Sequence, residues 1–156
     1  MARGDDAKVR TIASNRRARH EYHLLSEVEC GMVLRGTEVK SLRQGRASIA
    51  EAYGLIRRGE LYLVGATIPE YTHGNVFNHE PARERKLLLH KKELAQWDRA
   101  VREKGVTVVP LELFFSGHLV KIRMALAKGK KLYDKRETER TKDARRDIDR
   151  EMGRRR

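Results

Sequence analysis

The chain has 156 residues, of which 35 are Lys or Arg and 22 are Asp or Glu, for a formal net charge of +13. This length suits one domain of about 100 to 130 residues with tails and makes two independent domains a poor fit. A single cysteine, Cys30, excludes an intrachain disulfide and a Cys-rich zinc site. No apolar run approaches a membrane span and the N-terminus lacks a secretion signal, so we expect a soluble, cytoplasmic protein.

The N-terminal residues are polar and basic. Residues 1–14 show no sustained apolar period, which predicts a flexible basic arm. Asn15 is predicted to cap a helical turn running through Arg19, because its side chain can accept a hydrogen bond from a free backbone N–H. The rise in β-branched and apolar residues from Tyr22 to Leu34 then predicts a strand.

A short helix and a hairpin are expected next. Thr37 as the N-cap and Gly45 as the stop predict a helix over Glu38–Gln44. The segment Tyr53–Ile68 is typical of two strands around the turn signal Arg57–Glu60. We therefore expect a β-hairpin in this segment.

A loop, a strand and an amphipathic helix follow. Thr72–Arg83 is rich in turn residues and Lys86–His90 is apolar, which predicts a long loop and then a strand. Lys91–Lys104 carries apolar residues at helical spacing, with Trp97 among them and Gly105 at the expected C-cap. Trp97 is therefore interpreted as a core residue.

The clearest alternation in the chain predicts a half-buried strand. In Lys121–Leu126, one face carries Ile122, Met124 and Leu126, and the other carries Lys121 and Arg123. Val106–Phe115 is its expected partner across a turn at Ser116–Gly117. Short strands with few helices predict a mainly β fold, either a small antiparallel barrel or a sandwich.

Motifs of catalysis or metal binding are missing. Gly31–Gly36 has the spacing of a phosphate-binding loop, but Thr37 and Glu38 stand where Lys and Ser or Thr are required. The six histidines lack metal-ligand motifs, and no nucleophile-elbow or dinucleotide fingerprint is present. We therefore predict no catalytic residue, no metal site, no cofactor and no enzymatic activity.

The positive charge points to a polyanion partner, with a merely solvated basic face as the alternative. Basic groups recur at Arg16–Arg19, Arg83–Lys86, Lys91–Lys92 and Lys128–Lys131. Only nine aromatic residues are present, so recognition of single strands by stacked rings is improbable. Contacts to the phosphates and riboses of a folded RNA fit better.

Four motifs carry a resemblance to a known family. The motifs Gly36–Arg43, Gly74–Asn75 with Asn78–Pro81, Arg85–His90, and Lys128–Arg136 together resemble the SsrA-binding protein family, also called SmpB. The resemblance implies an oligonucleotide-binding (OB)-like β-barrel over residues 15–127. It also implies a factor that binds the tRNA-like domain of transfer-messenger RNA and delivers it to stalled ribosomes for trans-translation, reaching elongation factor Tu through the RNA. Nothing in the sequence demands more than a monomer.

The resemblance places Asn15 and Glu29 at or near the RNA-binding surface. Glu29 is unusual there; it could accept from base or 2′-hydroxyl donors, hold a neighbouring arginine, or be a solvated strand carboxylate. Basic residues elsewhere are expected to contact phosphates. The candidate RNA contacts are Asn15, Arg16, Arg17, Arg19, Glu29, Lys40, Arg43, Arg85, Lys86, His90, Lys121, Arg123, Lys128, Lys130 and Lys131.

Residues 128–156 form a tail with 13 Lys or Arg and 7 Asp or Glu. Such a tail buries almost nothing, so it is predicted to be disordered when free, and the resemblance implies a helix on the ribosome. The candidate ribosome contacts are the hinge Tyr133, Asp134, Lys135 and Arg136 and the helix stripe Ile148 and Met152. Two alternatives are a structural ribosomal protein and an RNA-processing enzyme.

Overall fold

The structure, a computed structural model, describes residues 8–74 and 77–130. No helix in these ranges is long and apolar enough to cross a membrane. The elements follow in this order: β1 (Val9–Ser14), α1 (Arg17–Glu21), β2 (Tyr22–Met32), α2 (Gly36–Arg43), β3 (Tyr53–Arg57), β4 (Glu60–Val64), β5 (Arg85–Leu88), α3 (Lys91–Ala100), β6 (Val106–Ser116) and β7 (Leu119–Gly129).

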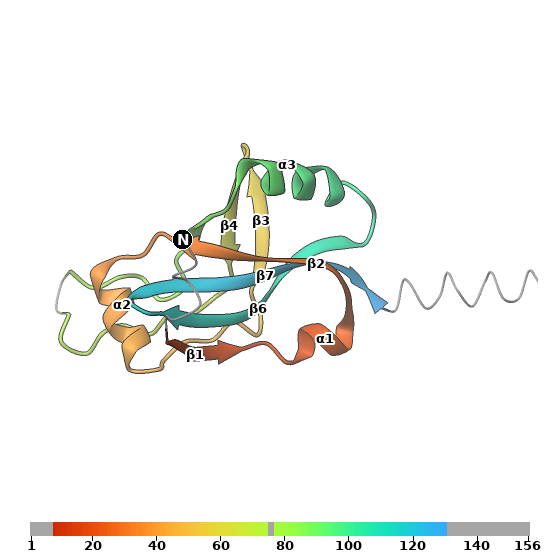
Figure 1. The fold of residues 1–156 in the computed structure, drawn as a ribbon. Helices are drawn as coiled ribbons and strands as arrows, with labels where there is room; N and C mark the ends of the chain where they lie inside the picture. Colours follow the sequence, from red (N-terminus) through yellow and green to blue (C-terminus); the bar gives the residue numbers. More distant parts are fainter. Residues whose placement is uncertain (1–7, 75–76, 131–156) are drawn as a thin grey trace, which may run out of the picture.

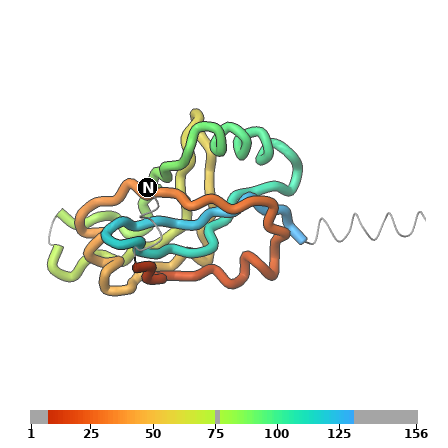
Figure 2. Tube along the Cα trace, viewed as in Figure 1, coloured from red at the N-terminus to blue at the C-terminus, as the bar shows by residue number. Residues whose placement is uncertain are grey.

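The strands form a closed antiparallel barrel (Figure 1). The sheet order is β1-β6-β3-β4-β5-β2-β7. Strand β6 also pairs with β7, so the strands from β6 to β7 in this order form a ring, and β1 lies outside the ring on β6. Figure 2 shows β2 running along β7. Strand β7 has its two long pairings with β2 and with β6. Closure leaves few unpaired strand edges. The barrel prediction is therefore confirmed, and the sandwich is excluded.

Strands β3 and β6 pair at a single point of the ring. Gly54 pairs there with Val108, and a Cβ on Gly54 would lie 2.7 Å from the Val108 Cγ1. A side chain at this position would push the two strands apart. Glycine is therefore required at this point of the barrel.

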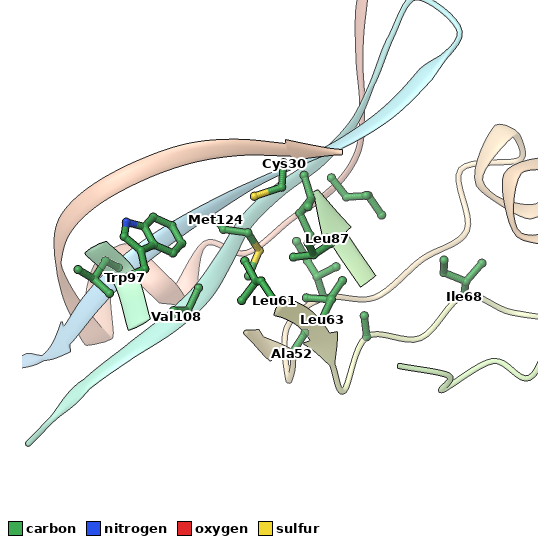
Figure 3. Close-up of a cluster of buried hydrophobic side chains, with 14 of the residues drawn as sticks. Cys30, Ala52, Leu61, Leu63, Ile68, Leu87, Trp97, Val108 and Met124 are labelled. Atoms are coloured by element: carbon green, nitrogen blue, oxygen red, sulfur yellow. The ribbon is translucent and has the colours of Figure 1, made fainter. Parts of the chain in front are cut away.

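The barrel interior holds the main core, part of which Figure 3 shows with Trp97 at one end of the cluster and Ile68 at the other. Trp97 of α3 is 3% exposed and donates its indole N–H to the Ser26 Oγ at 3.1 Å. Cys30 is fully buried. The three apolar residues of the β7 alternation, Ile122, Met124 and Leu126, also face this core, as the sequence predicts.

A second apolar cluster lies on the other face of β6 and β7. Ala18 of α1 packs there against Val109, Leu111, Ala125 and Ala127. The end of β7 is consequently buried on both faces. Its alternation ends at Ala125 because α1 covers the outer side, which the local pattern did not reveal.

The predicted N-terminal arm needs correction. Residues 9–14 form β1 and pair with β6, from Val9 opposite Ser116 to Ser14 opposite Glu112. Asn15 caps nothing, since Arg16 is the N-cap of α1 without a side-chain bond, and the Asn15 Nδ2 donates to the Pro110 carbonyl at 3.0 Å. Residues 9–14 pair with a free edge of β6. This long-range pairing replaces the flexible arm that the sequence predicts.

The other local predictions differ mainly in their boundaries. The hairpin turn is confirmed, with Arg58 at φ 53° and Gly59 at φ 73°, as a type I′ turn requires. Helix α2 begins at Gly36 rather than Glu38. Strand β7 continues to Gly129, two residues past the expected end of the domain, and Gly129 pairs with Tyr22.

Candidate RNA-binding surface

A buried charge cluster holds the loop before β5 against α2. The Glu38 carboxylate, fully buried, accepts hydrogen bonds from the Arg83 and Arg85 guanidiniums and from the Arg35 backbone N–H at 2.7 Å. Burial on its own would raise the pKa of Glu38, but these hydrogen bonds outweigh it and hold that pKa below its ordinary value. Glu38 is therefore a buried carboxylate anion at neutral pH.

Arg85 is a correction to the predicted RNA contacts. Its side chain is fully buried, and besides Glu38 it donates to the carbonyls of Ala66, Arg83 and Pro81. No solvent-facing donor remains on a buried side chain engaged in this way. Arg85 organises the loop from inside instead of contacting RNA.

His79 secures the same loop. Its Nε2 lies 2.8 Å from the Ile68 carbonyl and its Nδ1 lies 2.9 Å from the Thr37 Oγ1. A carbonyl can only accept, so Nε2 carries a proton and donates it to Ile68, while Nδ1 is hydrogen-bonded to the Thr37 hydroxyl. The sequence predicts Thr37 as the N-cap of α2, but in the structure Arg35 is the N-cap and the Thr37 hydroxyl is hydrogen-bonded to His79 of the loop.

A row of charges crosses the outer face of β2, β7 and β6. Glu29 lies opposite Arg123 in the β2–β7 register, with 3.3 Å between the Arg123 Nη2 and the Glu29 Oε1. Arg123 also donates to Glu112 at 3.1 Å, and Lys121 lies 4.0 Å from Glu29. Of the readings left open for Glu29, this geometry favours the one in which it holds a neighbouring arginine.

A groove beside α1 brings predicted RNA contacts from the N-terminal segment together with one from β7. Asn15, Arg16 and Arg19 line it together with Arg123, although about one hundred residues separate these positions in the sequence. His20 also lines this groove and was missed among the candidates, because an isolated histidine beside arginines carries no motif. Arg19 and the neighbouring Arg17 make exposed ion pairs, at 3.5 Å to Glu27 and 3.8 Å to Glu51, which leave them accessible.

The remaining candidates are spread around the barrel. Lys40 lies 5.6 Å from the centre of the Tyr71 ring, Lys86 pairs with Glu60 at 2.9 Å, and His90 is the N-cap of α3. Lys128 pairs with Glu103 at 3.2 Å. Arg43 and Lys130 have no ion pair among the described residues, and Arg43 is exposed. These predicted contacts thus come from α2, β5, the N-cap of α3 and the end of β7.

Exposed apolar residues form a groove that sequence reasoning also missed. Leu88 is 51% exposed and Leu119 is 64% exposed, and both line a groove with Gly31 and Lys121. Gly31 pairs with Leu88 across β2 and β5, and a Cβ on Gly31 would contact the Leu88 side chain at 3.5 Å. The position of Leu88 directly after buried Leu87 was the available signal.

The described residues contain no group of three or more His, Cys, Asp or Glu that could hold a metal ion. The hinge and helix stripe candidates, with Lys131, lie outside the described residues. These are Lys131, Tyr133, Asp134, Lys135, Arg136, Ile148 and Met152.

The family model described as SmpB protein matches residues 12–154. The chain belongs to the SmpB family. An SsrA-binding protein of Pelotomaculum thermopropionicum is 52% identical to this SmpB-family chain over 142 residues, covering 91% of this chain and 93% of that one. An SsrA-binding protein of Saccharopolyspora erythraea is 52% identical over 154 residues, covering 99% and 96%.

A solved structure is also similar to this SmpB-family chain. It is described as "tmRNA-SmpB: a journey to the center of the bacterial ribosome", with a TM-score of 0.63 and 44% sequence identity. The match covers 76% of this chain and 83% of that chain. The resemblance inferred from the four motifs is confirmed.

Proposed function

We propose that this chain binds the tRNA-like domain of transfer-messenger RNA and delivers it to stalled ribosomes for trans-translation. Membership in the SmpB family carries this proposal, together with relatives named SsrA-binding proteins and a similar solved structure described as tmRNA-SmpB in the bacterial ribosome. The chain acts as a binding factor without a catalytic step of its own, and it works in the cytoplasm, where ribosomes translate.

The barrel and the tail have separate tasks in this proposal. The barrel binds the RNA through its basic outer groups, among them Arg16, Arg19 and Arg123 along one groove. The tail, through Tyr133–Arg136 and the stripe of Ile148 and Met152, engages the decoding region and the messenger channel of the small ribosomal subunit. Elongation factor Tu is reached through the bound RNA.

The decisive experiment is to isolate the full-length protein from cells and to sequence the RNA bound to it. We expect one dominant structured RNA, the transfer-messenger RNA. A structural ribosomal protein would instead yield ribosomal RNA in constant proportion to ribosomes. That outcome would overturn the proposal.

A further inference from the structure

Four basic side chains gather at the end of the barrel where β6 turns into β7. Lys8 directly precedes β1 and Arg10 lies at its start, Arg43 comes from the last turn of α2, and His118 comes from the β6–β7 turn. They line one pocket together with Phe115 and Gly117. Because β7 begins directly after this turn and ends at Gly129, the pocket lies at the end of β7 opposite Gly129.

Hydrogen bonds fix this arrangement. The Gly117 N–H donates to the Lys8 carbonyl at 3.0 Å, and Arg10 pairs with Phe115 in the β1–β6 register. The Arg10 Nη2 donates to the Arg43 carbonyl at 2.9 Å. Three separate segments are thereby joined, so the pocket is formed before any ligand arrives.

Among the residues that the structure describes, no carboxylate compensates the positive charge of this pocket. Its lining contains no carboxylate, and within residues 8–74 and 77–130 no acidic side chain forms an ion pair with Lys8, Arg10 or Arg43. On the strand faces, by contrast, Arg123 and Lys86 each contact a carboxylate. An anion in this pocket would relieve the repulsion among its cations.

We propose that the pocket lined by Lys8, Arg10, Arg43 and His118 binds a backbone phosphate of RNA. This inference rests on the proposed function, which supplies a folded RNA as the partner. Arg10 uses one N–H on the Arg43 carbonyl and keeps other donors of its planar fork for phosphate oxygens. Phe115, buried in the lining, adds an apolar wall that strengthens charge-assisted hydrogen bonds.

The test variant is Lys8→Gln/Arg43→Gln in the full-length protein. Lys8 and Arg43 hold the pocket together only through their backbone carbonyls, so the substitutions remove two charges and keep both hydrogen bonds. The matched control is Arg99→Gln/Lys104→Gln, which removes the same charge from exposed positions at and beyond the end of α3. Equal melting temperatures of the two variants verify that both fold.

The measurement is the dissociation constant for the isolated tRNA-like RNA at several salt concentrations. We expect the pocket variant to bind about tenfold more weakly or worse, the usual consequence of losing charge-assisted hydrogen bonds. The slope of log affinity against log salt should fall by about 0.7 to 0.9 for the lost phosphate. The control should change neither quantity by a comparable amount.

A second measurement separates two sources of the phosphate. If the RNA arm is unchanged but the pocket variant binds ribosomes lacking transfer-messenger RNA more weakly than the control does, the phosphate belongs to ribosomal RNA and the site still stands. If pocket variant and control agree in both arms, the inference is wrong. Failure of the proposed function would look different, because the wild-type protein itself would then show no preference for the tRNA-like RNA.

Discussion

The carboxylate of Glu38 and the guanidinium of Arg85 form an ion pair in which both side chains are fully shielded from solvent. The pair joins α2 to β5 and is surrounded by further hydrogen bonds, from Arg83 to Glu38 and from Arg85 to four backbone carbonyls. A buried pair with its remaining hydrogen-bonding groups satisfied is costly to break, because the surviving partner stays charged and desolvated. The Glu38–Arg85 pair therefore holds the loop before β5 in place from inside the protein.

Replacing Glu38→Gln should strongly destabilise the fold. The variant leaves the Arg83 and Arg85 charges without a counterion, and we expect a loss of about 3 to 5 kcal/mol in the free energy of unfolding. Urea denaturation of both proteins provides the measurement. Glu60→Gln, which breaks the partly exposed pair with Lys86, is the control, and its loss should be much smaller because solvent screens an exposed ion pair. Equal losses in the two variants would contradict this account.

The same carboxylate predicts a pH dependence of stability. The pKa of Glu38 is lowered in the folded protein from its ordinary value of 4.5. Its contribution is therefore fully present above that value and is lost as the pH falls through the lower, folded pKa. Urea titrations between about pH 3 and pH 7 should show the stability gap between wild type and Glu38→Gln narrowing on acidification. A gap that stays constant with pH would argue against an ionised Glu38.

Cys30 should be unreactive in the native protein. Burial first, and then the nearby charge of Glu93, raise the pKa of its thiol to about 12. Almost no thiolate exists at neutral pH, and the side chain is fully buried. A thiol reagent followed by absorbance should label Cys30 only after denaturant is added. Rapid labelling of the folded protein would show that the barrel opens locally.

Two of the readings of Glu29, holding Arg123 and contacting the RNA directly, can be separated by a double-mutant cycle. If Glu29 acts by holding Arg123, then Glu29→Gln weakens binding to the tRNA-like RNA in the wild type but changes little once Arg123→Gln is present. Affinities of the wild type, both single variants and the double variant give the coupling free energy. Additive losses would instead indicate that Glu29 contacts the RNA directly.

Removing the tail should separate RNA binding from ribosome rescue. The sequence places the end of the barrel domain at Ala127. In the structure β7 continues to Gly129, which pairs with β2, and Lys128 pairs with Val106. We therefore expect truncation after Lys130 to leave RNA affinity and melting temperature nearly unchanged and to abolish tagging on stalled ribosomes. Truncation after Ala127 should lower the melting temperature as well. Equal loss of binding and tagging would refute the division of labour.

The helix stripe of the tail gives a finer test of the same division. Ile148→Glu/Met152→Glu should impair tagging on stalled ribosomes with little effect on affinity for the tRNA-like RNA, because the barrel carries RNA binding. Thr141→Glu/Ala144→Glu, which adds the same charge at two other positions of the tail, shows whether any added charge has this effect. Normal tagging by Ile148→Glu/Met152→Glu would remove the case for an apolar contact in the messenger channel.

Local patterns were sufficient for features that depend on neighbouring residues. Alternation placed Ile122 and Met124 in the core and Arg123 outside, and the glycine after Arg58 located the hairpin turn. Helical spacing put Trp97 in the core. These predictions succeeded because each depends on the short-range periodicity of strands, helices and turns.

The sequence by itself determined that this protein is a small, basic, mainly β domain with a charged tail, and its motifs indicated the SmpB family. Only the tertiary structure decided how its charges are used. Arg85 is buried with Glu38, Arg123 is held by Glu29, and Lys8 lines the same pocket as Arg43. The physical reason is that closing the barrel sets long-range register and burial, and these determine whether an arginine faces a carboxylate, the solvent or an RNA phosphate.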